Sequence, residues 1–249
     1  MLASWFTNAG PAREGNQDAV LVGGCVYASL ASPVSSEIRE GGLIAVADGV
    51  GGYPGGDMAA RILLTRLAGY SSPPGDGTAE SEVRRLLAEA SADLAAAAAR
   101  DSLLALMSSA VAGVCLVGDT LTAFNCGDCR VYLLRRPYLS RLTRDHSAVQ
   151  PLLDAGLIDE DGMRLHPKRH VLTSSIGAGV NPPEVFFKTV PARAPARLFL
   201  CSDGVWEALP LETLEEIVCL PPGEAAAGLA GALFQVQASD NVSFIILDI

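Results

Sequence analysis

Two apolar segments of this 249-residue chain end in the same short motif, Asp-Gly-Val. "LIAVAD" ends at Asp48 and "LFLCSD" ends at Asp203, and each run has the length and composition of a buried strand. A carboxylate at the end of a buried strand is costly unless a partner offsets its charge. A chain that places one there twice is expected to fold so that both strand ends reach a shared site.

Two further aspartates stand where strands begin. Asp18 opens "DAVLV", and Asp240 precedes "NVSFIIL". If the strand from Asp18 pairs antiparallel with the strand that ends at Asp48, the two carboxylates meet at one edge of a sheet. The same reasoning brings Asp203 and Asp240 together. The sequence therefore predicts two sheets, each with a carboxylate pair at its rim, that face each other across a cleft.

The rest of the pattern predicts strand hairpins and helix pairs, not a strict alternation of strands and helices. Turn signals at Gly118–Asp119 and Gly127–Asp128 divide residues 109–135 into three strands. Periodicity predicts helices over 57–67, 79–100, 211–218 and 223–237, and strands over 18–24, 42–48, 196–203 and 241–249. An antiparallel α+β sandwich accounts for this order of elements.

Residues 1–249 are expected to form a single domain. The Pro/Gly/Ser-rich stretch 70–81 predicts a surface loop, because strands of similar character lie on both sides of it. A short strand and a helix capped by Ser147 are expected over residues 141–156. The polar, turn-rich segment from about 147 to 170 is interpreted as a flap.

Four carboxylates cannot share a small site without a counter-charge, because repulsion and desolvation raise their pKa values or break the fold. Mg²⁺ or Mn²⁺ resolves this, since both take oxygen ligands. Arg13, which precedes Asp18 in "AREGNQD", is suited to bind a phosphate beside such ions through two parallel hydrogen bonds. The alternative is that each Asp-Gly pair is only a turn and Arg13 only a surface residue.

Composition narrows the choice of partners. The formal net charge of −10 argues against a nucleic-acid or anionic-membrane surface, which needs a basic patch. No apolar run approaches the ~20 residues of a membrane span, and the first residues do not have the pattern of a signal peptide. Six cysteines are too few for a disulfide framework and sit mostly in apolar strands, as reduced cysteines do. A cytoplasmic protein is expected.

Taken together, the motifs resemble those of the metal-dependent protein phosphatases of type 2C. The stretches that carry the resemblance are "AREGNQD", "VADGVGG", "NCGDCRVYLL", "LTRDHS", "HPKRHVLTSSIG", "CSDGVWE" and "SDN". They follow the family's order and span nearly the whole chain, whose length is similar to that of the compact bacterial members. The resemblance implies a four-layer α-β-β-α sandwich, in which two antiparallel sheets are flanked by helix pairs and form one catalytic domain.

The resemblance also implies roles for the aspartates. Asp48 would bridge two tightly bound ions, Mn²⁺ or Mg²⁺, with the Gly49 carbonyl on one of them. Asp203 and Asp240 would complete the ligands of the other ion. Asp18 would hold metal-bound water.

A third, weaker ion is implied beside the first two, held by Asp128 together with Asp203. Arg13 would bind the substrate phosphate. Asn241, beside Asp240, and Gln17, beside Asp18, would support the site from behind.

The implied reaction is hydrolysis of phosphoserine or phosphothreonine without a covalent enzyme intermediate. A hydroxide that bridges the two ions would attack phosphorus in line, while the ions and Arg13 offset charge on the phosphoryl oxygens. The implied partners are phosphorylated proteins and a bacterial Ser/Thr kinase that the phosphatase opposes. A monomer is expected, with no nucleic-acid or membrane partner.

Three residues depart from the family pattern. Gln17 stands where many members have glutamate, and activity is expected to survive that change. Val50 stands where animal members carry a histidine that is a proposed general acid, so the proton donor must be a metal-bound water or another histidine. Cys129 replaces a serine in the family's "GDSR" stretch, which is interpreted as a packing change.

Two other functions remain open. A non-catalytic pseudophosphatase would serve as a binding module, but it should lack metal ligands. A phosphatase of small phosphomonoesters would use the same chemistry, so the motifs do not exclude it. Among the histidines, His146 is expected to cap or brace the helix that follows it, while His166 and His170 are candidates for substrate contact or proton donation.

Three short motifs are interpreted as coincidental. Cys129 and Arg135 have the spacing of cysteine-dependent phosphatases but lie in a strand pattern, not in a phosphate-binding loop. Cys126 and Cys129 form a Cys-x-x-Cys motif without a second pair for zinc. "GVGGYPGGD" lacks the lysine of a nucleotide phosphate loop.

Overall fold

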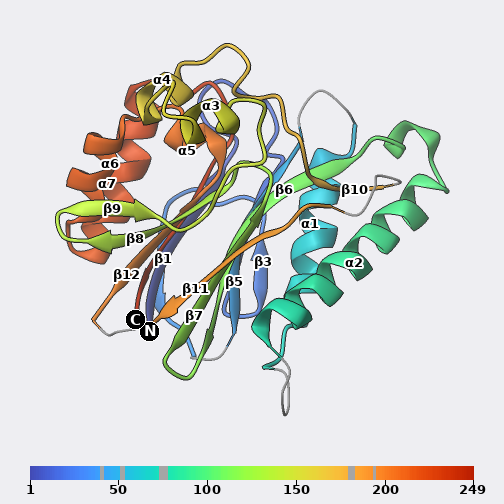
Figure 1. Cartoon of the computed structure of the whole chain (residues 1–249), viewed down its shortest axis with the longest axis horizontal. Coiled ribbons are helices and arrows are strands. Elements are labelled where there is room, and N and C mark those ends of the chain that lie inside the picture. The colour runs from blue at the N-terminus through green and yellow to red at the C-terminus, as the bar shows by residue number, and fades with distance from the viewer. Residues whose placement is uncertain (40–41, 51–53, 73–77, 179–182, 193–194) are drawn as a thin grey trace.

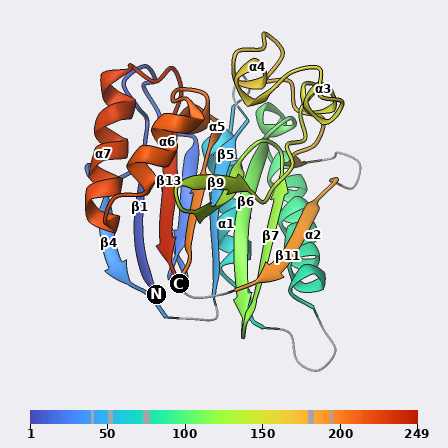
Figure 2. The ribbon, with the colours of Figure 1, turned by 60° about the vertical axis from the view of Figure 1, so that its left-hand side comes forward.

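The computed structural model describes residues 1–39, 42–50, 54–72, 78–178, 183–192 and 195–249. These residues form two stacked antiparallel sheets with a pair of helices on each outer face (Figures 1 and 2). The expected four-layer α-β-β-α sandwich of two antiparallel sheets flanked by helix pairs is therefore confirmed.

Sequence-distant strands pair within each sheet. The first sheet contains, in spatial order, β4 (Val34–Glu37), β1 (Leu2–Asn8), β13 (Val242–Asp248), β12 (Arg197–Cys201), β8 (Arg130–Arg135) and β9 (Tyr138–Arg141). The second contains β11 (Phe186–Pro191), β7 (Thr120–Cys126), β6 (Ser108–Val117), β5 (Leu43–Gly49), β2 (Asp18–Val22) and β3 (Cys25–Tyr27), with β10 (Ile176–Gly177) paired to β6.

The helices divide between the two faces. Helices α1 (Gly56–Leu67) and α2 (Ala79–Ala98) cover the second sheet, and α6 (Leu211–Val218) and α7 (Pro222–Gln235) cover the first (Figure 1). The other helical segments among the described residues are short: a 3-10 turn (Ser102–Leu104), α3 (Gln150–Asp154), α4 (Glu160–Arg164) and α5 (Asp203–Trp206).

The strands that lead to the candidate site are buried on both faces. In β5, Ile44 and Val46 pack between the two sheets, while Leu43, Ala45 and Ala47 pack against α1 and α2. Alternate side chains of a strand point to opposite faces, so a strand between two packed layers must be apolar throughout. This explains the uninterrupted apolar run that ends at Asp48.

Both Asp-Gly glycines are fixed by close backbone packing. A Cβ atom at Gly49 would lie 2.2 Å from the carbonyl oxygen of Gly56, the first residue of α1. A Cβ atom at Gly204 would lie 2.0 Å from the carbonyl oxygen of Asn241. Any side chain at these positions would force the backbones apart. The two glycines thus hold Asp48 and Asp203 close to the elements that surround the cleft.

Several boundaries differ from the sequence-based expectations. The strand predicted to end at Asp203 ends at Cys201, and Asp203 begins α5 instead. The final strand begins at Val242, and β2 ends at Val22 because Gly23 and Gly24 adopt positive φ angles of 59° and 79°. The short strand expected from residue 141 onward lies at Tyr138–Arg141.

The expectation that Ser147 caps a helix is wrong. Helix α3 begins after Val149, which offers no side-chain cap. Ser147 instead forms an isolated β-bridge with Leu172, so it links the two ends of the segment predicted to be a flap. Residues 51–53 of the glycine-rich stretch and 73–77 of the expected surface loop lie outside the described residues.

Candidate functional site

The structure brings Asp18 directly beside Asp48. Strands β2 and β5 are antiparallel, and these two residues are register partners at the edge of the sheet. Asp18 is buried, with 2% of its surface exposed. Its Oδ2 atom accepts a hydrogen bond from Ser202 Oγ at 2.7 Å, whereas Oδ1 is buried without a hydrogen-bond partner among the described residues.

Asp203 and Asp240 meet at the matching end of the other sheet. Strands β12 and β13 are antiparallel with Cys201 opposite Phe244, so the residues that follow β12 and precede β13 lie together. Asp203 occupies the first turn of α5, where the helix dipole favours a negative charge. The four strand-end aspartates therefore converge from two sheets, as the strand pattern requires.

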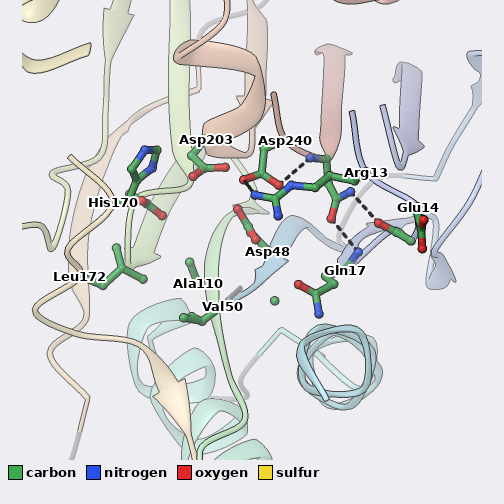
Figure 3. A pocket seen from close by; sticks show the side chains of 14 residues that line it. Arg13, Glu14, Gln17, Asp48, Val50, Ala110, His170, Leu172, Asp203 and Asp240 are labelled. Atoms are coloured by element: carbon green, nitrogen blue, oxygen red, sulfur yellow. Dashed lines mark hydrogen bonds and ion pairs between the residues drawn. The ribbon is translucent and has the colours of Figure 1, made fainter. Parts of the chain in front are cut away.

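A cleft of about 450 Å³ opens at this rim (Figure 3). The residues expected at a metal or phosphate site that line it are Arg13, Gln17, Asp48, Gly49, Asp128, Asp203, Asp240 and Asn241, and Val50 and His170 line it too. Asp18 is not among the lining residues and lies buried behind them. Among the site residues predicted from the sequence, Asp18 is therefore the one that does not line the cleft.

The carboxylates of the cluster resist ionisation in the protein alone. Burial is the main cause that raises the pKa of Asp18 to about 7, and the charges of Asp203 and Asp240 add to it. Burial, followed by the charges of Asp18 and Asp203, holds the pKa of Asp48 well above its ordinary value. The pKa values of Asp128 and Asp203 are also raised, again chiefly by burial.

This donor set fits hard divalent cations. Its described side chains offer carboxylate oxygens in a buried cluster, and one of these oxygens, Asp18 Oδ1, has no hydrogen-bond donor. Mg²⁺ and Mn²⁺ prefer such oxygen ligands and would offset the repulsion that raises the pKa values. Asp48, Asp203, Asp240 and Asp128 could hold the ions directly.

Arg13 reaches the rim of the cleft from the loop after β1. Its Nη2 atom is 2.7 Å from Asp240 Oδ2 (Figure 3). Its Nε atom donates to the Ser239 carbonyl at 3.3 Å. The side chain is half exposed, at 52%. Because Arg13 remains accessible while it is anchored at the rim, its guanidinium can turn toward a bound anion.

Asn241 holds the loop that carries Arg13. Its Oδ1 atom accepts a hydrogen bond from the Gln17 backbone N–H at 2.8 Å, and its Nδ2 atom donates to the carbonyls of Ala9 and Gly15 at 3.0 and 2.8 Å. These three bonds join residues from the two ends of the chain. Asn241 therefore fixes the geometry of this loop.

Asp128 is fixed from behind by groups that sequence reasoning did not assign. Its backbone carbonyl accepts a hydrogen bond from Trp206 Nε1 at 3.0 Å. The guanidinium of Arg130 lies 3.5 Å from the centre of the Trp206 ring and forms a buried ion pair with Asp145 at 2.7 Å. Arg130 lies in the "GDCR" stretch and Asp145 in the "TRDH" stretch. These two motifs were the sequence signal from which the ion pair could have been predicted.

His146 braces the turn before Asp128 and does not brace helix α3. Its backbone N–H donates to the Gly127 carbonyl at 2.8 Å, and its Nδ1 atom accepts from the Gly127 N–H at 3.3 Å. Gly127 has a φ of +98°, and a Cβ atom there would lie 2.4 Å from that of Ala110. The turn predicted at Gly127–Asp128 thus depends on glycine and on His146.

Glu207 is a second residue that the sequence did not single out. It lies one turn after Asp203, and its side chain is only 8% exposed. Burial and the charge of Asp203 raise its pKa to about 8. One oxygen lies 2.9 Å from Arg169 Nε and the other 3.2 Å from His170 Nδ1. Glu207 therefore ties the end of the 147–170 segment to the wall of the cleft.

The cysteine motifs have no chemistry of their own here. Cys126 and Cys129 are both fully buried in or beside strands. Burial, together with nearby carboxylates, holds the pKa of Cys129 well above that of a free thiol. A reactive thiolate is therefore disfavoured at this position.

The fold and the cleft define an α-β-β-α sandwich with a carboxylate cluster between its sheets. The family model described as protein phosphatase 2C matches residues 31–219. The chain therefore belongs to the protein phosphatase 2C family. Within the described residues, none of the helices combines the length and the apolar character that crossing a bilayer requires.

Individual relatives are bacterial. The chain is 28% identical over 208 residues to the serine/threonine protein phosphatase PstP of Mycobacterium tuberculosis, which covers 83% of this chain and 40% of PstP. It is 30% identical over 180 residues to the serine/threonine phosphatase Stp of Listeria monocytogenes, covering 71% of each. A crystal structure of the PstP catalytic domain in complex with two manganese ions superposes with a TM-score of 0.79 at 25% identity, covering 100% of this chain and 99% of that one.

Proposed function

We propose that this chain is a metal-dependent phosphatase that hydrolyses phosphoserine and phosphothreonine in proteins. The observation that carries the proposal is the convergence of four aspartates from two sheets on one cleft that Arg13 borders. The protein phosphatase 2C membership supports it, as do the names of PstP and Stp. In this proposal residues 1–249 act as one catalytic domain, and residues 147–170 act as its flap.

The proposed ligands follow the carboxylate cluster. Asp48 would hold two ions, Mn²⁺ or Mg²⁺, one of them shared with the Gly49 carbonyl and the other with Asp203 and Asp240. Asp128 would join Asp203 at a third, weaker ion. The manganese ions in the PstP structure support this choice of metal.

Bound divalent ions would lower the pKa of coordinated water and offset charge on a phosphoryl group. Arg13 would bind two phosphoryl oxygens and so orient the ester for in-line attack. Asp18, buried behind Asp48, would accept hydrogen bonds from water in the cleft. Asn241 would keep Arg13 in reach by fixing its loop, and Gln17 would line the same wall.

Two alternatives share this fold and site: one uses the same chemistry and the other none. A small-molecule phosphomonoesterase would use the same residues, and a cleft that is open at the rim admits either substrate. A pseudophosphatase should lack ligands, and here the full set of aspartates is present. The phosphatase would be a monomer in the cytoplasm and would oppose a bacterial Ser/Thr kinase on shared substrates.

Turnover of a phosphothreonine peptide and of p-nitrophenyl phosphate tests the proposal. We expect both to be hydrolysed with added Mn²⁺ or Mg²⁺ and neither to be hydrolysed in EDTA. Hydrolysis of p-nitrophenyl phosphate without the peptide would favour the small-molecule alternative. No hydrolysis of either compound at neutral to alkaline pH would refute the enzyme assignment and favour the binding module.

A further inference from the structure

Residue 50 of this chain is a valine. Animal relatives carry the proposed general acid, a histidine, at this position. A serine or threonine alkoxide is a poor leaving group and needs a proton as the P–O bond breaks. Val50 cannot supply one. In the proposed function Arg13 binds the phosphoryl group, and the lining aspartates are engaged as metal ligands.

Among the described residues that line the cleft, His170 is the one histidine. It comes from the end of the 147–170 segment, and its side chain is 51% exposed. Figure 3 shows His170 and Arg13 on opposite sides of the carboxylates Asp203 and Asp240. A phosphoryl group bound between them would thus have Arg13 on one side and the imidazole on the other.

Glu207 orients the imidazole. Its Oε1 atom is 3.2 Å from His170 Nδ1, an ion-pair distance that places the carboxylate against that nitrogen. Arg169 Nε lies 2.9 Å from the other oxygen, which fixes the carboxylate in turn. No hydrogen bond or ion pair between described residues engages Nε2, and none joins His170 to Asp203. A histidine held through one nitrogen by a buried carboxylate presents the other nitrogen for proton transfer.

We propose that His170 is the proton donor to the leaving oxygen, with Glu207 as its positioning residue. The proposal rests on the proposed phosphatase function. As water bonds to phosphorus through its oxygen and gives one proton to solvent, the ester P–O bond breaks and its electron pair stays on the seryl or threonyl oxygen. That oxygen takes the proton from Nε2, and the neutral imidazole regains a proton from solvent before the next turnover.

The test compares leaving groups in wild type and His170→Gln with Mn²⁺ at saturation. A nitrophenolate leaves without taking up a proton. A phenolate needs a proton donor more than a nitrophenolate does, and a threonine alkoxide needs one most. We expect His170→Gln to lower kcat for the phosphothreonine peptide by about 10²-fold and to leave kcat for p-nitrophenyl phosphate within about threefold. Across a series of aryl phosphates, log kcat should depend more steeply on leaving-group acidity in the variant.

His166→Gln is the matched control. His166 is in the same segment, but its Nδ1 atom accepts a local hydrogen bond from the Lys168 N–H at 3.1 Å, and it does not line the cleft. We expect its leaving-group dependence to equal that of wild type. An equal loss of both activities in His170→Gln together with weaker Mn²⁺ binding by calorimetry would overturn the proposal, because it would indicate a metal ligand. The proposal would also be overturned if the steeper dependence of log kcat on leaving-group acidity appeared in His166→Gln and not in His170→Gln.

Wild-type behaviour separates this proposal from the proposed function. If wild type hydrolyses neither substrate, the phosphatase assignment fails. If wild type hydrolyses both and His170→Gln matches it on the peptide, only the assignment of the proton donor fails. Glu207→Gln should give a smaller change in the same direction, since the amide keeps the size and place of the carboxylate beside Nδ1 but carries no charge.

Discussion

Asp203→Ala is expected to lower kcat/KM for a phosphothreonine peptide by about 10³-fold or more. Asp203 brings the charge of the first sheet to the cleft, and in the proposed site it contributes to two ions. Its removal should not unfold the protein, because the buried carboxylate has a raised pKa and is repelled by Asp240. The melting temperature in EDTA should therefore stay the same or rise.

The matched control is Asp119→Ala. Asp119 follows Gly118 at the turn between β6 and β7; it is exposed and does not line the cleft. Its activity should stay within about twofold of wild type, as is usual for surface substitutions. Near wild-type activity in Asp203→Ala, in a protein that melts normally, would refute the assignment of the site.

The second large effect concerns the pH dependence of stability without metal. The pKa of Asp18 is raised to about 7, and the pKa values of Asp48, Asp128 and Asp203 are raised too. A group whose pKa is higher in the folded state binds its proton more tightly there. Its stabilising contribution is complete below its ordinary pKa, near 4, and is lost as the pH rises through the folded value, near 7 for Asp18.

In EDTA, the melting temperature is therefore expected to fall by several degrees between pH 5 and pH 8. With saturating Mn²⁺ the fall should vanish, because the ions bind the deprotonated carboxylates and stabilise the folded state. His146 acts in the opposite sense, since burial lowers its pKa. The variant Asp18→Asn separates the contribution of the aspartate cluster from that of His146. In EDTA, its melting temperature should depend less on pH than that of wild type. A wild-type curve that rises from pH 5 to pH 8 in EDTA would contradict this account.

The sequence predicts the site better than it predicts the edges of the sheets. Asp18 and Asp48 could be paired in advance, because antiparallel strands that begin and end at carboxylates place them together. Asp203 was placed at a strand end, whereas it begins a helical turn. The error did not move the carboxylate to another rim, since α5 starts two residues after β12.

Strand β1 was missed although it has a strand on each side in its sheet, β4 and β13. Ala3 and Trp5 face the other sheet, while Phe6 faces α6 and α7, so the strand is buried on both faces and shows no alternation. Edge strands such as β4 and β11 were missed for the opposite reason. They are short or largely exposed, so their apolar signal is weak.

Contacts between distant segments of the chain are the other part of the site that the sequence does not predict. The pair His170–Glu207 and the stack of Arg130 on Trp206 join residues that no local pattern relates. The two Asp-Gly-Val segments are an exception, because their repetition reflects one requirement met on each sheet. Each needs a glycine where another backbone passes within contact distance, and each positions a carboxylate at the cleft.

A Mn²⁺ titration of the metal-free chain, with binding followed by calorimetry and turnover measured in the same samples, tests the central claim most directly. The account predicts two tightly bound ions per chain, as in the PstP structure, and turnover that rises as they bind. It also predicts that Asp48→Asn loses tight binding and turnover together. Turnover without bound ions, or undiminished Mn²⁺ affinity in Asp48→Asn, would contradict the claim that the aspartates of the two sheets form a catalytic metal centre.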